Sequence, residues 1–152
     1  MLFRAAARSL VAVAALSPLA AARIAPRPAA LREVTIEAHE YAFVVPATVP
    51  AGLTAFRFVN RGAKTHEVQF FRFNRGIDAR TARGYLGATD VPDSVADSSG
   101  SVLIAGPGAS ARERILVQLE RGELYALVCA FRDAPGQPRH QTMGMVGLVE
   151  VR

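Results

Sequence analysis

The feature that most constrains the fold is an alternation of apolar and polar side chains with a period of two residues. At the start of the first such segment, Val34, Ile36 and Ala38 alternate with polar residues, as expected for a strand with one buried face. Turn-forming Gly, Pro and Asn residues separate this segment from others of similar length. Six strands are predicted, at residues 33–39, 54–60, 66–73, 112–119, 124–130 and 146–152. Several short strands with few helical stretches predict an all-β fold, a Greek-key β-sandwich around one core.

The middle of the chain, residues 77–108, is predicted to be an insertion of helix and loop between strands. Asp78 is a favourable N-cap for a short helix that Gly87 would end. The remainder is rich in Pro, Ser, Asp and Gly, so it is predicted to be mostly loop, with a short strand at residues 102–105. This insertion contains no candidate metal ligand.

The N-terminus has the pattern of a secretion signal. Arg4 and Arg8 precede an apolar run over residues 10–22, which is shorter than the roughly 20 residues that a membrane-spanning helix needs. We therefore predict a signal peptide at residues 1–22 rather than an uncleaved anchor. A flexible leader follows at residues 23–32, and the folded domain is residues 33–152. The mature protein is expected to be exported, periplasmic or secreted, without stable membrane insertion.

The charged residues narrow the possible partners. The formal net charge is +5, and the basic residues are scattered along the chain rather than gathered in blocks. This distribution, together with export, argues against nucleic-acid binding. A basic balance is compatible with an acidic partner protein. We expect a monomer.

The single cysteine, Cys129, directs attention to the last third of the chain. One cysteine forms no intramolecular disulfide, and a free thiol in an exported protein is open to oxidation. A buried, inert cysteine is the ordinary alternative. Cys129 lies at the end of the next-to-last strand, however, with His140 and Met145 after it and His66 at the head of an earlier strand. One Cys, two His and a weakly bound Met form the donor set of blue-copper electron-transfer sites.

Three motifs resemble those of the cupredoxin family, the blue type 1 copper proteins that include plastocyanin. They are Phe58-Val59-Asn60 leading to His66, Tyr125-x-x-x-Cys129, and His140-x-x-x-x-Met145. The resemblance covers about residues 33–152.

By this resemblance the chain is a plastocyanin-like electron-transport protein that binds one copper ion. His66, Cys129 and His140 would be ligands, with Met145 as the axial one. The resemblance also implies that Asn60 braces the cysteine loop and that an exposed edge of His140 passes the electron to redox partner proteins.

One departure from the family leaves alternatives open. Eleven positions separate Cys129 from His140, whereas most cupredoxins place these ligands only a few residues apart. The extra stretch, residues 132–139, either bulges outward while the ligands converge, or marks a fold that has lost or altered its copper site. Copper handling is a second hypothesis, since Met143 and Met145 offer soft donors for Cu(I). A copper-free interaction module is a third.

Enzyme classes find little support in the sequence. The chain has three histidines, His39, His66 and His140, too few for the trinuclear cluster of a multicopper oxidase, and we expect His39 to lie on the surface. No Ser-His-Asp pattern, phosphate-binding glycine loop or zinc cluster of useful spacing is present. Zinc bound by Cys129, His66 and His140 is chemically possible but leaves the Met spacing unexplained. We predict a protein that is not an enzyme.

Overall fold

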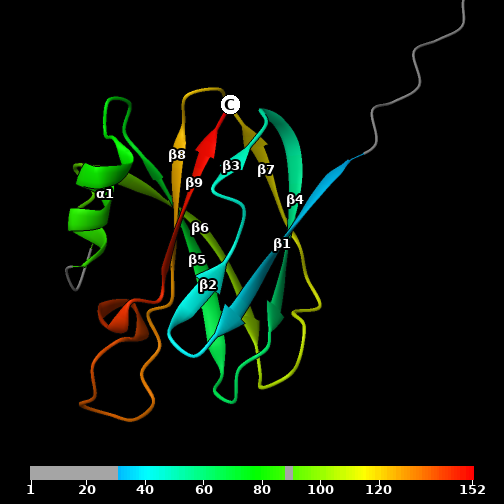
Figure 1. Cartoon of the computed structure of the whole chain (residues 1–152), viewed down its shortest axis with the longest axis vertical. Coiled ribbons are helices and arrows are strands. Elements are labelled where there is room, and N and C mark those ends of the chain that lie inside the picture. The colour runs from blue at the N-terminus through cyan, green and yellow to red at the C-terminus, as the bar shows by residue number, and fades with distance from the viewer. Residues whose placement is uncertain (1–30, 88–90) are drawn as a thin grey trace, which may run out of the picture.

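The protein is a sandwich of two β-sheets (Figure 1). The computed structural model describes residues 31–87 and 91–152. One sheet has the strand order β2-β1-β4-β7, with bounds Ala42–Val44, Arg32–His39, Gly52–Asn60 and Ile115–Leu119. The other has the order β3-β9-β8-β5-β6, with bounds Thr48–Val49, Val146–Val151, Leu124–Val128, His66–Phe73 and Ala96–Ala105. The predicted all-β Greek-key sandwich is confirmed.

The main core lies between the two sheets and follows from the alternation in the sequence. Val34, Ile36 and Ala38 of β1 are buried, while Thr35 between them is exposed and Glu37 is half-buried. The aromatic rings of Phe56 on β4 and Phe70 on β5 meet edge to face, with centroids 5.0 Å apart. Such contacts add to the stabilisation from burial alone, so they hold the two sheets together.

Strand β8 is buried along its whole length. Tyr125 and Leu127 belong to the core between the sheets, whereas Ala126 and Val128 belong to a second cluster that includes α1, Ala79–Leu86. Because successive side chains of a strand point to opposite faces, both faces of β8 need a cover, and α1 covers the outer one. In Figure 1, α1 lies beside β8 and β9, outside the sandwich.

The predicted helix is confirmed in position and in its cap. The side chain of Asp78 accepts a hydrogen bond from the Thr81 amide, and Gly87 is the C-terminal cap. The carbonyl of Leu86, the last residue of α1, accepts a hydrogen bond from the Gln141 side chain at 3.4 Å. The helix is therefore tied to the segment that contains His140.

The prediction of a mostly irregular stretch before residue 108 is wrong. Strand β6 is ten residues long and pairs antiparallel with β5 along most of its length. Its polar residues, such as Asp97 and Ser98, misled the sequence reasoning, because an edge strand with one face in solvent needs few apolar side chains. Strand β7 starts at Ile115, later than predicted, and the short strands β2 and β3 were not predicted.

The expected signal peptide, residues 1–22, and most of the leader, residues 23–32, lie outside the described residues. Within residues 31–87 and 91–152, no helix has the length and apolar character needed to cross a membrane. His39 is exposed, as expected.

Candidate metal centre

Three of the predicted ligands meet at one end of the sandwich. His66 is the first residue of β5, Cys129 directly follows β8, and His140 begins the short 3-10 helix η1, His140–Met143. One ligand atom from each residue lies within 4.8 Å of the other two. All three side chains are buried, with exposures of 0%, 0% and 1%. The structure thus brings together residues that are up to 74 positions apart.

The three atoms that converge are the Nδ1 nitrogens of both histidines and the cysteine sulfur. The Nδ1 atoms are 3.2 Å apart, and the Sγ of Cys129 lies 3.5 Å from Nδ1 of His140 and 3.9 Å from Nδ1 of His66. A circle through these three atoms has a radius of about 2.1 Å, which is close to the metal–nitrogen and metal–sulfur bond lengths of about 2.0–2.3 Å. The triangle has the size that one coordinated transition-metal ion requires.

The protonation and hydrogen bonding of the donor groups bear on metal binding. Burial, together with the nearby His140, lowers the pKa of His66, which favours the neutral imidazole that binds metals. The Nε2 atom of His66 is buried without a hydrogen-bond partner, so the polar contacts of this ring are made through Nδ1. Burial raises the pKa of the Cys129 thiol. Binding of a metal by the thiolate must therefore release a proton.

The long spacing between Cys129 and His140 does not separate these ligands, because the intervening loop is closed at its base. The His140 amide donates to the Phe131 carbonyl at 2.8 Å, and the Gln141 amide donates to the Cys129 carbonyl at 2.8 Å. Residues 132–139 form a loop beyond this closure. Of the two outcomes considered for the extra residues, the structure shows the outward loop with converging ligands.

Met145 is fully buried in the core cluster that contains Cys129. Its amide donates to the His140 carbonyl at 3.0 Å, and its carbonyl accepts from the Cys129 amide at 3.2 Å. The turn before it depends on Gly144, whose φ of 108° lies in a region that favours glycine. The backbone thus ties Met145 to both neighbouring candidates, and its role as axial ligand stays a prediction.

Asn60 does not brace the cysteine loop as expected. Asn60 is buried, but its side chain bonds the carbonyls of Lys64, Ala105 and Gly106 and the Gly62 amide. It therefore braces the β4–β5 loop that leads to His66, and none of these partners lies in the cysteine loop.

Glu67 makes the contact to the cysteine loop instead. Its Oε1 accepts from the Ala130 amide at 3.1 Å and from the Gln69 side chain at 3.0 Å. This buried carboxyl therefore links β5, directly after His66, to the residue that follows Cys129. Burial raises the pKa of Glu67. Its position directly after a candidate ligand in the sequence was a signal that pointed to this residue and was missed.

His140 does not present an exposed edge, contrary to expectation. Its Nε2 lies 3.1 Å from Oδ1 of Asp133, and the ring of Tyr41 meets the imidazole edge to face at 5.1 Å. Tyr41 and Asp133 also bond one another at 2.7 Å, and Lys64 lies 3.6 Å from the same carboxylate. We refer to Tyr41, Lys64 and Asp133 as the cap. No motif pointed to these residues, because they come from two turns and a polar loop.

No protein-family model matches the chain, and no curated protein matches it. Several solved structures are similar to it. An auracyanin from Roseiflexus castenholzii is 22% identical over 82% of this chain and 99% of that chain, with a TM-score of 0.48. Auracyanin A from Chloroflexus aurantiacus, described as a "blue" copper protein, is 19% identical over 79% and 99%, with a TM-score of 0.45. Reduced rusticyanin is 20% identical over 80% of each chain, with a TM-score of 0.48.

The sheet order and the buried donor triangle define the class on their own: a β-sandwich with a candidate site for a transition-metal ion at one end. In its fold and in the set of His66, Cys129 and His140, the chain resembles the cupredoxins, as its sequence motifs do. These residues are arranged as in a type 1 copper site, where two imidazoles and a thiolate form a trigonal plane.

Proposed function

We propose that this protein is an exported one-electron carrier whose type 1 copper ion is held by His66, Cys129 and His140, with Met145 as axial ligand. The observation that carries the proposal is the buried triangle of two Nδ1 atoms and one sulfur. A copper ion bound there would supply a centre that cycles between Cu(II) and Cu(I), and soft sulfur donors support both states.

The chain contributes a rigid frame around the donors. His66 is fixed by the pairing of β5 with β6, where it lies opposite Ala105. Cys129 and His140 are fixed by the hydrogen bonds that close the loop, and Glu67 ties the two regions together. A frame of this kind keeps the donors in place when the charge of the ion changes. The burial of all three side chains also excludes water from the site.

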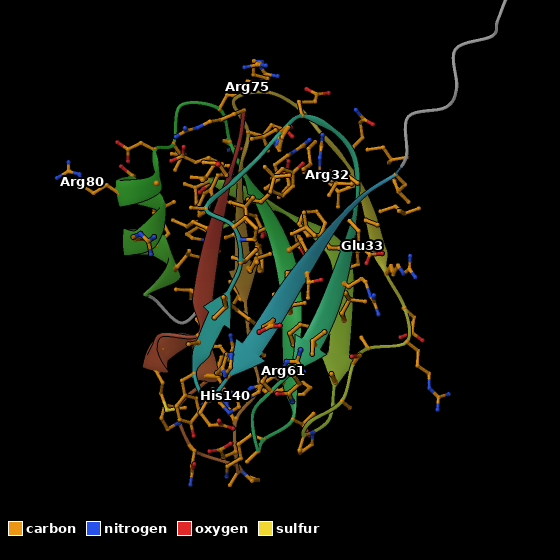
Figure 2. The ribbon with its side chains drawn as sticks, turned by 45° about the vertical axis from the view of Figure 1, so that its right-hand side comes forward. Arg32, Glu33, Arg61, Arg75, Arg80 and His140 are labelled. Carbon is orange, nitrogen blue, oxygen red and sulfur yellow. The ribbon has the colours of Figure 1, made fainter. Side chains whose placement is uncertain are left out.

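Exchange of electrons with a partner would take place at this end of the molecule. Figure 2 shows His140 and Arg61 at the same end of the sandwich, opposite Arg75. The side chains of Arg61 and Lys64 are 56% and 50% exposed. These exposed cations, although paired with Glu37 and Asp133, support an acidic partner that docks at the cap, since opposite charges speed association. The electron would then pass through or beside the cap, because His140 itself is covered.

The proposal is tested by the visible spectrum after Cu(II) is added to the purified protein. An intense thiolate-to-copper charge-transfer band is expected, together with a stoichiometry of one ion per chain. Cys129→Ser is the control and should lack the band. Reversible one-electron reduction of the bound ion completes the assignment. A protein that holds no copper, or gives no such band, would contradict the proposal.

Copper handling remains a second candidate on the observation that Met143, in η1, is 37% exposed and lies close in sequence to the buried Met145. An exposed soft donor beside the centre suits the capture of Cu(I). The same variant separates the two functions: Cys129→Ser should abolish a blue site and should only weaken Cu(I) binding by Met and His. A chain that binds neither ion would be left with the role of an interaction module.

A further inference from the structure

Asp133 is the one acidic group that bonds a candidate ligand directly within the described part of the chain. Its Oδ1 lies 3.1 Å from Nε2 of His140, although the two residues are seven positions apart on opposite sides of the loop. The side chain of Asp133 is only 17% exposed, and that of His140 is 1% exposed. This contact is therefore shielded from competing water.

The contact determines which nitrogen of His140 carries the proton. The Tyr41 hydroxyl donates to Oδ2 of Asp133, which leaves Oδ1 to face Nε2 of His140, and an ionised carboxylate is an acceptor only. Nε2 of His140 must then be the N–H donor. The Nδ1 atom of a neutral ring is left with its lone pair, and this atom faces Cys129 and His66 at 3.5 Å and 3.2 Å.

We propose that Asp133 is a positioning residue that fixes His140 as the Nε2–H tautomer and directs its Nδ1 lone pair into the donor triangle. The carboxylate acts through the imidazole and lies on its far side from the triangle. It would also increase the basicity of the ring toward a metal, as carboxylates do when they bond metal-bound histidines. The part of this inference that concerns metal binding rests on the proposed function. The part that concerns the tautomer of His140 does not require a metal.

The rest of the cap holds the carboxylate in place. The Tyr41 hydroxyl donates to Oδ2 at 2.7 Å, and the Lys64 ammonium lies 3.6 Å from the same oxygen. One oxygen of Asp133 is thus engaged by the cap and the other by His140. Tyr41 has a φ of 58°, the one positive value for a residue other than glycine in the described ranges. Such a conformation is uncommon and is often found at functional positions, and here it lies in the turn that brings the phenol over His140.

The decisive experiment reads the tautomer in the metal-free protein. Nitrogen-15 NMR of the histidine rings distinguishes Nε2–H from Nδ1–H, and His140→Gln identifies the signals of His140. The wild type should show His140 as the Nε2–H form. Asp133→Ala should mix the two tautomers, whereas Asp133→Asn should retain the Nε2–H form, because its amide oxygen still accepts the bond. Asp97→Asn, an exposed carboxylate paired with Arg72, is the matched control and should leave the signals unchanged.

Copper affinity provides the second measurement, by competition with a chelator of known strength. Asp133→Ala should weaken binding by about 10–100-fold, the usual effect of losing a partner of a metal-bound histidine. Tyr41→Phe should weaken binding less, since it loosens the carboxylate without removing it. A wild-type His140 found as Nδ1–H, or an alanine variant with unchanged tautomer and affinity, would overturn the inference. A protein that shows the tautomer shift but binds no copper would instead disprove the proposed function alone.

Discussion

Replacement of Asn60 by alanine tests how the loop before His66 is held. The side chain of Asn60 is fully buried. Its amide nitrogen lies 2.7, 2.9 and 3.0 Å from the carbonyls of Lys64, Ala105 and Gly106, and its oxygen accepts from the Gly62 amide at 2.9 Å. This one side chain therefore joins the β4–β5 loop to the end of β6, next to the strand pair that positions His66.

The cost follows from the number of bonds that are lost. An amide nitrogen has two hydrogens, so Asn60 makes at most two full donor bonds and one acceptor bond at these four contacts. Each net bond contributes about 1 kcal/mol, and a stranded buried partner costs about 1–3 kcal/mol. Asn60→Ala should thus lower the free energy of unfolding by roughly 2–4 kcal/mol, a sum over three bonds with partial access of the freed groups to water.

Urea unfolding of the metal-free protein measures this cost. Asn74→Ala is the control, because Asn74 makes a single exposed side-chain bond to the Ser94 carbonyl and should cost about 1 kcal/mol or less. The blue band expected with Cu(II) should persist in folded Asn60→Ala, since the side-chain hydrogen bonds of Asn60 go to Gly62, Lys64, Ala105 and Gly106 and not to Cys129 or His140. A loss in Asn60→Ala no larger than in the control would refute the bracing role.

Two further predictions concern buried ionisable groups on the five-stranded sheet. Burial raises the pKa of Glu67, so the protein loses stability as the pH rises from the unfolded value near 4.5 through the folded value. Urea unfolding should therefore find Glu67→Gln more stable relative to wild type at pH 7 than at pH 4, and a pH-independent difference would contradict this. Burial and the bond to Glu123 raise the pKa of Tyr125, so stability should fall above pH 10 by up to about 1.4 kcal/mol per pH unit. This decrease should be smaller in Tyr125→Phe, and equal slopes in both proteins would exclude Tyr125 as its source.

The sequence predicted the sandwich because its physical cause is local. A strand with one buried face must alternate, and β1 and β7 do so, as does β4 from Phe56 to Asn60. The apolar strand β8 was also predicted. That the core covers one of its faces and α1 the other was seen only in the structure. Strand β6 was largely missed because an edge strand is held by backbone pairing with β5, which leaves little trace in side-chain pattern.

The candidate ligands were found from their residue types, whereas the residues that hold them in place, Glu67 and Asp133, were not. Thiol, imidazole and thioether groups are rare enough that their spacing is informative, and the structure brings His66, Cys129 and His140 together. Glu67 and Asp133 are common acidic residues, and their roles depend on tertiary contacts to Ala130 and His140. Such contacts have no period and no fixed spacing, so one sequence alone does not reveal them.

The loop between Cys129 and His140 joins two candidate ligands and also contains Asp133, which supports one of them. A shorter connection would satisfy the metal geometry equally well, since the bonds at the base of the loop already align the ligands. What the additional residues supply is Asp133, which bonds His140 on the side away from the donor triangle. The loop therefore converts a ring edge that would face water into a buried, hydrogen-bonded one. If electrons reach the centre from this end, they pass through or beside the cap, and exchange should then depend on how Tyr41 and Asp133 pack against His140.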